Sequence, residues 1–250
     1  MISLIIEGAT AVATLCRAPV NAINDAWLAR LNAILDELEG DPEVSVLWLR
    51  SNERVFCAGA DLEFMRQRFL TEEGRTLMIS FTRGLQEVYA RLERLGAVTV
   101  AEIGGAALGG GFELALACDL RIVADTAKIG LPEARLGLLP AAGGTQRMTR
   151  LCGEGISRRL ILGAEMIEGK DAVALGLAQW RAPAAELEAA ARALVARLAK
   201  LPRRALAACK QCIAAAADGG NGYEVELDGS RMLLATPDTQ DRVRRFLEKR

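Results

Sequence analysis

Two glutamates occupy apolar surroundings in this sequence, and their side chains could move protons. Glu113 lies between Phe112 and Leu114, and Glu133 directly follows Pro132. Apolar surroundings disfavour a charged carboxylate and raise its pKa, so that it can exchange a proton near neutral pH. If the two side chains met, one could hold a water molecule while the other donated a proton. Such a pair is a minimal set for adding water across a carbon–carbon double bond.

Both glutamates also have a structural interpretation, which is the commoner one for a single glutamate in such a place. Glu113 could cap a backbone group or pair with Arg147 or Arg135, and Glu133 could be solvated in a loop. The chemical hypothesis therefore depends on the two side chains meeting in space.

A glycine-rich stretch precedes Glu113, with five glycines among residues 104–111. Glycine lets the backbone approach a ligand closely, and a helix that begins there presents free N–H groups and the positive end of its dipole. This suits negative charge, either on a phosphate or on an oxyanion formed during a reaction. A tight, closely packed turn is the alternative. Glu113 lies three residues beyond Gly110, roughly one helical turn along.

A second small-residue loop, residues 55–62, follows another expected strand. The N–H groups of Ala60 and Gly110 could converge on one oxygen and stabilise an enolate or a tetrahedral oxyanion, each contributing about 3–4 kcal/mol. The chain has no histidine, which excludes Ser-His and Cys-His hydrolase mechanisms and most zinc sites. Acid–base chemistry then falls to carboxylates, lysines, tyrosines or cysteines. These observations favour an enolate over a phosphate as the ligand of the glycine-rich stretch.

The elements that must position these residues alternate between strands and helices, which predicts an α/β fold with loops meeting at one end of the strands. We predict strands over residues 2–7, 9–16, 44–49, 98–101, 119–124, 128–130 and 176–180. Helical spacing or propensity predicts helices over residues 24–40, 61–69, 75–95, 145–152, 154–162, 170–175, 184–198, 203–217, 223–234 and 237–249. A long loop over residues 131–145 separates the two halves, and loops of this length are often functional.

Composition narrows the class of protein. A chain of 250 residues that is 51% hydrophobic and 25% charged is typical of a soluble globular protein of one domain, with or without an appendage. The net charge of −1, without a basic block, argues against nucleic acid as a partner. The apolar runs are too short to span a membrane, so we expect no membrane partner. The N-terminus reads as a strand, not a signal peptide, and a cytoplasmic location is expected. The six scattered cysteines are expected to be free thiols.

Three segments in order resemble the crotonase superfamily and, within it, the enoyl-CoA hydratases. They are VFCAGADL at 55–62, AALGGGFELALACD at 106–119 and IGLPEARLGLLPAAGGTQR at 129–147. Each motif alone is weak, but the three at these separations are highly specific. The resemblance extends from residues 19–22 to residues 246–250, nearly the whole chain.

The resemblance implies a crotonase-like spiral of ββα units over residues 1–195. It also implies a helical trimerisation region over residues 196–250, and a homotrimer or a dimer of trimers. The substrate would be an acyl-CoA thioester, as in fatty acid metabolism, with no metal and no cofactor beyond the coenzyme A of the substrate.

The resemblance also implies roles for individual residues. Ala60 and Gly110 match the two positions whose N–H groups form the oxyanion hole for the thioester oxygen. Glu113 and Glu133 match the two catalytic glutamates, the first as base on water and the second as proton donor to the α-carbon. The substrate-binding positions would be those of the oxyanion hole together with Val20, Ala22, Ala58, Asp61, Leu62, Pro132 and Lys249. Of these, Val20 and Ala22 would lie at the nucleotide end, and Lys249 would reach a CoA phosphate from a neighbouring subunit.

One position departs from the family pattern, because Ala141 stands where a glycine is usual. It is expected to narrow or shift the acyl pocket without removing a catalytic position. The preferred hypothesis is hydration of a trans-2-enoyl-CoA to the 3-hydroxyacyl-CoA. The alternatives are isomerisation, decarboxylation or C–C cleavage on the same scaffold, or a non-catalytic CoA-binding or RNA-binding relative or a scaffold subunit of a complex. The presence of both glutamates favours the hydratase.

Overall fold

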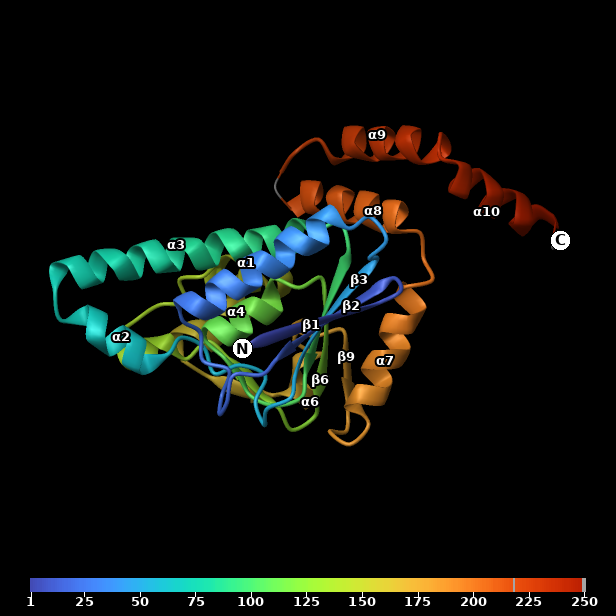
Figure 1. The fold of residues 1–250 in the computed structure, drawn as a ribbon. Helices are drawn as coiled ribbons and strands as arrows, with labels where there is room; N and C mark the ends of the chain where they lie inside the picture. Colours follow the sequence, from blue (N-terminus) through green and yellow to red (C-terminus); the bar gives the residue numbers. More distant parts are fainter. Residues whose placement is uncertain (218, 249–250) are drawn as a thin grey trace.

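The computed structural model describes residues 1–217 and 219–248, and it has the predicted α/β architecture (Figure 1). A six-stranded sheet of order β1-β2-β3-β4-β6-β9 forms its centre. Its strands are β1 (Ile2–Glu7), β2 (Thr10–Leu15), β3 (Val46–Ser51), β4 (Val98–Ile103), β6 (Leu120–Ala124) and β9 (Trp180–Ala182). The first pair is antiparallel and the remaining neighbours are parallel. The carboxyl ends of β3 and β4 therefore lead their following loops to the same edge.

A smaller sheet of order β5-β7-β8 continues the spiral beside the first. It consists of β5 (Ala107–Leu108), β7 (Lys128–Gly130) and β8 (Met166–Glu168). An isolated bridge between Ile23 and Ala60 joins the loop after β2 to the loop after β3, and a second between Cys57 and Ala107 joins the loop after β3 to β5. The loops near residues 23, 60 and 107 are thus held together by backbone pairing.

Helices α1 (Asp25–Gly40), α3 (Glu72–Arg94) and α4 (Gly110–Leu116) lie on one side of the six-stranded sheet, and α7 (Leu187–Leu198) lies on the other (Figure 1). The side chain of Asn24 accepts the N–H of Trp27 and caps α1, as the sequence predicts. The apolar residues of α1 and α3 recur at helical spacing and are buried in the core. The remaining elements of the core are α2 (Leu62–Phe69), the 3-10 helix η1 (Glu133–Leu136), α5 (Gly144–Leu162) and α6 (Gly169–Ala172).

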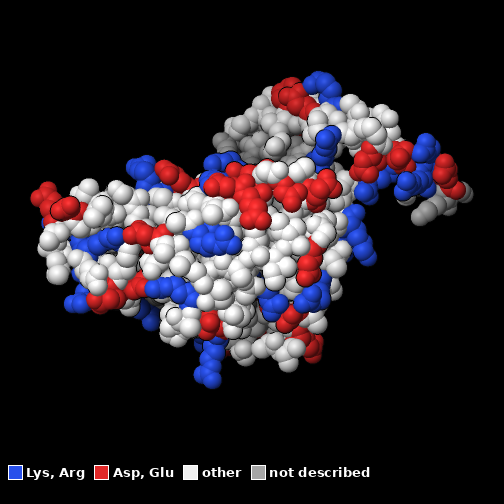
Figure 2. All heavy atoms as spheres, viewed as in Figure 1, with Lys and Arg blue, Asp and Glu red and all other residues white. Residues whose placement is uncertain are grey.

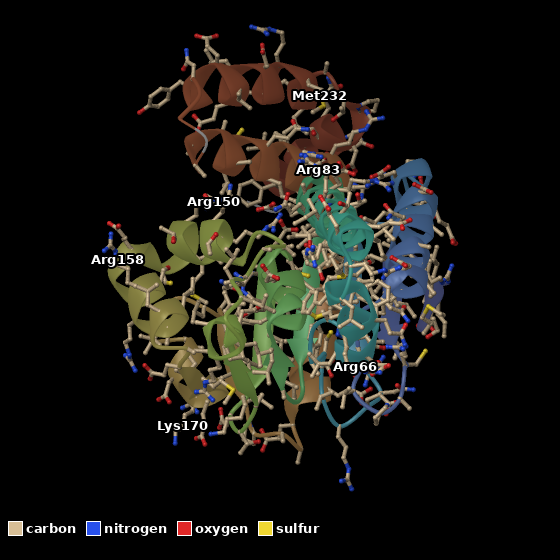
Figure 3. All side chains as sticks on the ribbon, turned by 90° about the vertical axis from the view of Figure 1, so that its left-hand side faces the viewer. Arg66, Arg83, Arg150, Arg158, Lys170 and Met232 are labelled. Carbon is tan, nitrogen blue, oxygen red and sulfur yellow. The ribbon has the colours of Figure 1, made fainter. Side chains whose placement is uncertain are left out.

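Of the last three helices, α8 (Arg203–Ala217) lies against one end of the core, and α9 (Gly222–Leu234) and α10 (Pro237–Glu248) extend beyond it (Figure 1). In Figure 3, Met232 of α9 lies with α8 in a separate upper layer. Lys210 fastens α8 to the core, because its ammonium lies 2.7 Å from a carboxylate oxygen of Asp119 and donates to the carbonyls of Leu95 and Ala97. The division of the chain at residue 195 stays a prediction.

Four details differ from the predicted elements. The strand predicted at 176–180 is displaced to β9, since Gly176 adopts a φ of +76° and the chain turns there. The helices predicted at 145–152 and 154–162 form one element with a break at Gly153, and α6 is shorter than the predicted helix at 170–175. The strands β5 and β8 were not predicted, because they are too short to show a periodic pattern in the sequence. In the part of the chain described, no helix is long and apolar enough to cross a membrane.

Candidate active site

A cavity of about 590 Å³ opens between the carboxyl-end loops and helix α3. It brings together both predicted glutamates and the two predicted N–H donors, Ala60 and Gly110. The other predicted substrate-binding positions that line it are Val20, Ala22, Ala58, Asp61, Leu62 and Pro132. Lys249 lies outside the described residues. Residues predicted from four separate segments of the chain therefore share one cavity.

Backbone pairing places the two N–H donors side by side. Ile23 donates its N–H to the carbonyl of Gly59, and Asp61 donates to the carbonyl of Ile23, so the parallel bridge leaves the N–H of Ala60 unused. Gly110 is the first residue of α4, where an N–H has no partner within the helix. A Cβ atom on Gly110 would lie 3.8 Å from the nitrogen of Ala60. Both N–H groups can therefore face one oxygen.

Glycine is required at the start of α4. Gly109 has a φ of +52°, and a Cβ atom there would lie 2.9 Å from Oε1 of Glu133. Side chains are disfavoured at such a φ, and this one would also displace the glutamate. The glycine-rich stretch thus combines an unusual turn with a close approach to a titratable group.

Glu113 is fixed and almost completely buried, with 3% of its surface exposed. Its Oε1 accepts the N–H of Gly144 at 2.7 Å, so Glu113 does bind a backbone group, as its structural interpretation proposed. The pKa of Glu113 is raised to about 7, chiefly by burial and to a lesser extent by the nearby Glu133, against the opposing effects of the N–H groups of Gly144 and Ala142 and the charge of Arg147. The predicted direction of the pKa shift is confirmed. A carboxyl group with this pKa can accept a proton near neutral pH.

Neither arginine considered as a partner for Glu113 pairs with it. The guanidinium of Arg147 binds Glu93 at 2.8 and 3.0 Å and donates to the carbonyl of Ala142. Arg135 donates to the carbonyl of Ala164. Arg147 therefore supports the loop that holds Glu113, and the carboxyl group of Glu113 stays available to the cavity.

Glu133 begins the 3-10 helix η1 and is half-buried. Its Oε2 is buried and has no hydrogen-bond partner in the described structure. Burial raises its pKa, which confirms the predicted direction and excludes full solvation of this side chain. An unpartnered oxygen favours the protonated form, which is the form that can donate a proton.

The polar end of the cavity lies at the loop before α1. Arg17 donates to a carboxylate oxygen of Asp61 at 2.8 Å and to the carbonyl of Ala22. Asp61 also caps α2 by accepting the N–H groups of Glu63 and Phe64. The Arg17 hydrogen bond holds the pKa of Asp61 below its usual value. The sequence interpretation missed Arg17, although it directly precedes the loop expected to touch the substrate.

Fold and cavity together define an α/β protein in which Ala60, Gly110 and two carboxyl groups line one cavity. The chain belongs to the enoyl-CoA hydratase/isomerase family, whose pattern it matches over residues 6–250. The resemblance stated from the sequence is thereby confirmed.

Named relatives agree with this assignment. The chain is 35% identical to the short-chain-enoyl-CoA hydratase of Clostridium acetobutylicum, over 98% of this chain and 93% of the relative. It is 34% identical to the 2,3-dehydroadipyl-CoA hydratase of Escherichia coli, over 92% and 88% of the two chains. The crystal structure of an enoyl-CoA hydratase from Bacillus anthracis superposes with a TM-score of 0.92 at 31% identity, covering 100% of this chain and 96% of that one. The crotonase-like fold is confirmed.

Proposed function

We propose that this protein adds water reversibly across the 2,3 double bond of a trans-2-enoyl-CoA, giving the 3-hydroxyacyl-CoA. The observation that carries the proposal is the pair of glutamates with raised pKa values in one cavity, beside the N–H groups of Ala60 and Gly110, to which the described residues offer no backbone acceptor. The hydratase names of relatives at about one-third identity over nearly the full length support it.

In this mechanism the thioester oxygen accepts hydrogen bonds from the N–H groups of Ala60 and Gly110. These bonds stabilise the enolate that forms when the double bond is attacked, and each contributes about 3–4 kcal/mol to lowering the barrier. The donors also draw electron density from the β-carbon and make it electrophilic. Backbone donors suit this task because they need no reorganisation as charge develops.

A hydroxyl group is then added to the β-carbon and a proton to the α-carbon. Ionised Glu113 takes a proton from the water as its oxygen bonds to the β-carbon, and protonated Glu133 gives its proton to the α-carbon. The sum is one hydroxyl at the β-carbon and one hydrogen at the α-carbon. Glu113 ends protonated and Glu133 ionised, and proton exchange with solvent restores the starting state.

Coenzyme A would enter along the polar end of the cavity, past the loop of Val20 and Ala22 and then past Ala58, Asp61 and Leu62. The acyl chain would occupy the apolar end, where Met78, Phe81 and Leu85 of α3 line the cavity. Pro132 would contact the acyl group beside Glu133, and Lys249 of a neighbouring subunit would reach a CoA phosphate. We expect no metal and no separate cofactor.

A homotrimer or a dimer of trimers, acting in the cytoplasm, completes the proposal. A groove between α9 and α10 is lined by Leu234, Val243 and Leu247, which are each more than half exposed. Burial of such an apolar patch between subunits would stabilise the oligomer in proportion to the apolar area removed from water. On the face shown in Figure 2, acidic and basic side chains are interspersed, which does not favour nucleic acid as a partner.

The test is incubation of the purified protein with trans-2-enoyl-CoA thioesters of several chain lengths. Loss of the conjugated thioester absorbance together with formation of 3-hydroxyacyl-CoA is the expected result. Incubation with a trans-3-enoyl-CoA tests the isomerase alternative, because isomerisation creates the conjugated absorbance. Binding of CoA thioesters without either change would favour a non-catalytic role.

A further inference from the structure

The side chain of Tyr89, on α3, reaches the start of α4, although the two residues in contact are 21 positions apart in the sequence. It is fully buried and donates its hydroxyl hydrogen to the carbonyl of Gly110 at 3.0 Å. Gly110 is the residue whose N–H faces the cavity. The phenol therefore contacts the same residue that supplies one of the two proposed donors, but from the rear of the site.

The backbone at this point has no side chains of its own to restrain it. Residues 109–111 are three glycines, and without side chains their peptide planes turn more freely than any others. The peptide group between Gly109 and Gly110 carries the N–H of Gly110. Its carbonyl oxygen, on Gly109, accepts the N–H groups of Phe112 and Glu113. Tyr89 provides the side-chain restraint on the next peptide, through the carbonyl of Gly110.

The hydroxyl is a permanent donor in this position. Burial raises the pKa of Tyr89 well above its usual value, and the proximity of Cys57 and Glu113 raises it further. The phenol thus stays protonated over the pH range in which the glutamates titrate. It does not line the cavity, so it has no access to the reacting atoms of a substrate.

We propose that Tyr89 is a positioning residue for the oxyanion hole: by holding the carbonyl of Gly110 it limits rotation about the two backbone bonds that link this carbonyl to the N–H aimed at the thioester oxygen. The inference rests on the proposed function for the identity of the ligand. Its physical basis is that a donor stabilises charge only when it is aimed at the oxygen before the reaction begins.

The test compares Tyr89→Phe, which removes only the hydroxyl, with two control variants. Tyr223→Phe removes the chain's other phenol hydroxyl, from a side chain that is 81% exposed. Val88→Ala removes methyl groups from a buried neighbour on the same helix, and it destabilises the core without touching Gly110. Steady-state kinetics, thermal melting and absorbance spectra of bound 4-(dimethylamino)cinnamoyl-CoA are measured for all four proteins. A polarised thioester carbonyl shifts that absorbance to the red.

We expect Tyr89→Phe to lower kcat about tenfold with KM within twofold of wild type, and to reduce the red shift of the bound thioester. Tyr223→Phe should match wild type, and Val88→Ala should lower the melting temperature while keeping the red shift. An unchanged red shift in Tyr89→Phe, or an equal loss of kcat in Val88→Ala, would overturn the inference. A red shift absent from wild type would overturn the proposed oxyanion hole itself, which distinguishes the two failures.

Discussion

Glu113 is predicted to make the folded protein less stable at the pH where it works. Its pKa rises from 4.5 to about 7 on folding, chiefly through burial. At 1.36 kcal/mol per pKa unit, the ionised form destabilises the folded state by about 3 kcal/mol. The sign follows from proton binding: the folded protein holds this proton more tightly, so the destabilisation is complete above pH 7. It is absent below pH 4.5.

Glu113→Gln removes this titration while keeping an oxygen that can accept the N–H of Gly144. We expect the variant to be more stable than wild type at pH 8, by up to about 3 kcal/mol, although its activity falls at least about 10²-fold. The gain should shrink as pH falls through 7 and disappear near pH 4.5. Urea unfolding at pH 8, 6.5 and 5 measures it. A variant no more stable than wild type at pH 8, or one with the same gain at pH 5, would refute the reasoning.

Four further outcomes follow from the geometry. The wild-type kcat/KM should rise with pH through a midpoint of about 7, because Glu113 must be ionised, and fall again at higher pH as Glu133 loses its proton; an acid limb centred below pH 5.5 would contradict this. Glu133→Gln should lower kcat at least about 10²-fold in initial-rate assays without loss of thermal stability. Gly109→Ala should destabilise the fold by about 1–3 kcal/mol in urea unfolding and reduce kcat, since the residue has a φ of +52° and its Cβ would approach Glu133. Competing substrates should show kcat/KM at least tenfold higher for trans-2-hexenoyl-CoA than for 2,3-dehydroadipyl-CoA, because burying a carboxylate beside the apolar residues of α3 is unfavourable.

Elements with a long periodic pattern were predicted well from the sequence. The bounds of α8 were predicted as observed, and α1 and α3 lie within a few residues of their predicted ranges. The apolar spacing of these helices is local information, and burial against the sheet selects the same residues. By contrast, β5 and β8 contain only two or three residues and exist because their neighbours pair with them. Such pairing is decided by distant parts of the chain.

The site shows the same division between local and distant information. The small-residue loops and the glutamates were visible in the sequence, and the structure brings them to one cavity; their roles stay predictions. The sequence did not reveal that the N–H of Gly144 holds Glu113 from 31 residues away, or that Tyr89 touches Gly110. These contacts join residues whose local patterns indicate only burial or a loop.

The central claim is that two glutamates catalyse hydration of the double bond, with the hydroxyl added to the β-carbon and the proton to the α-carbon. Crotonyl-CoA incubated with the protein in D₂O and followed by NMR tests it most directly. We predict one deuterium at C2 and a hydroxyl at C3 with wild type, and little of this product with Glu113→Gln or Glu133→Gln. Deuterium at C4, or the same product at the same rate from either variant, would contradict the account.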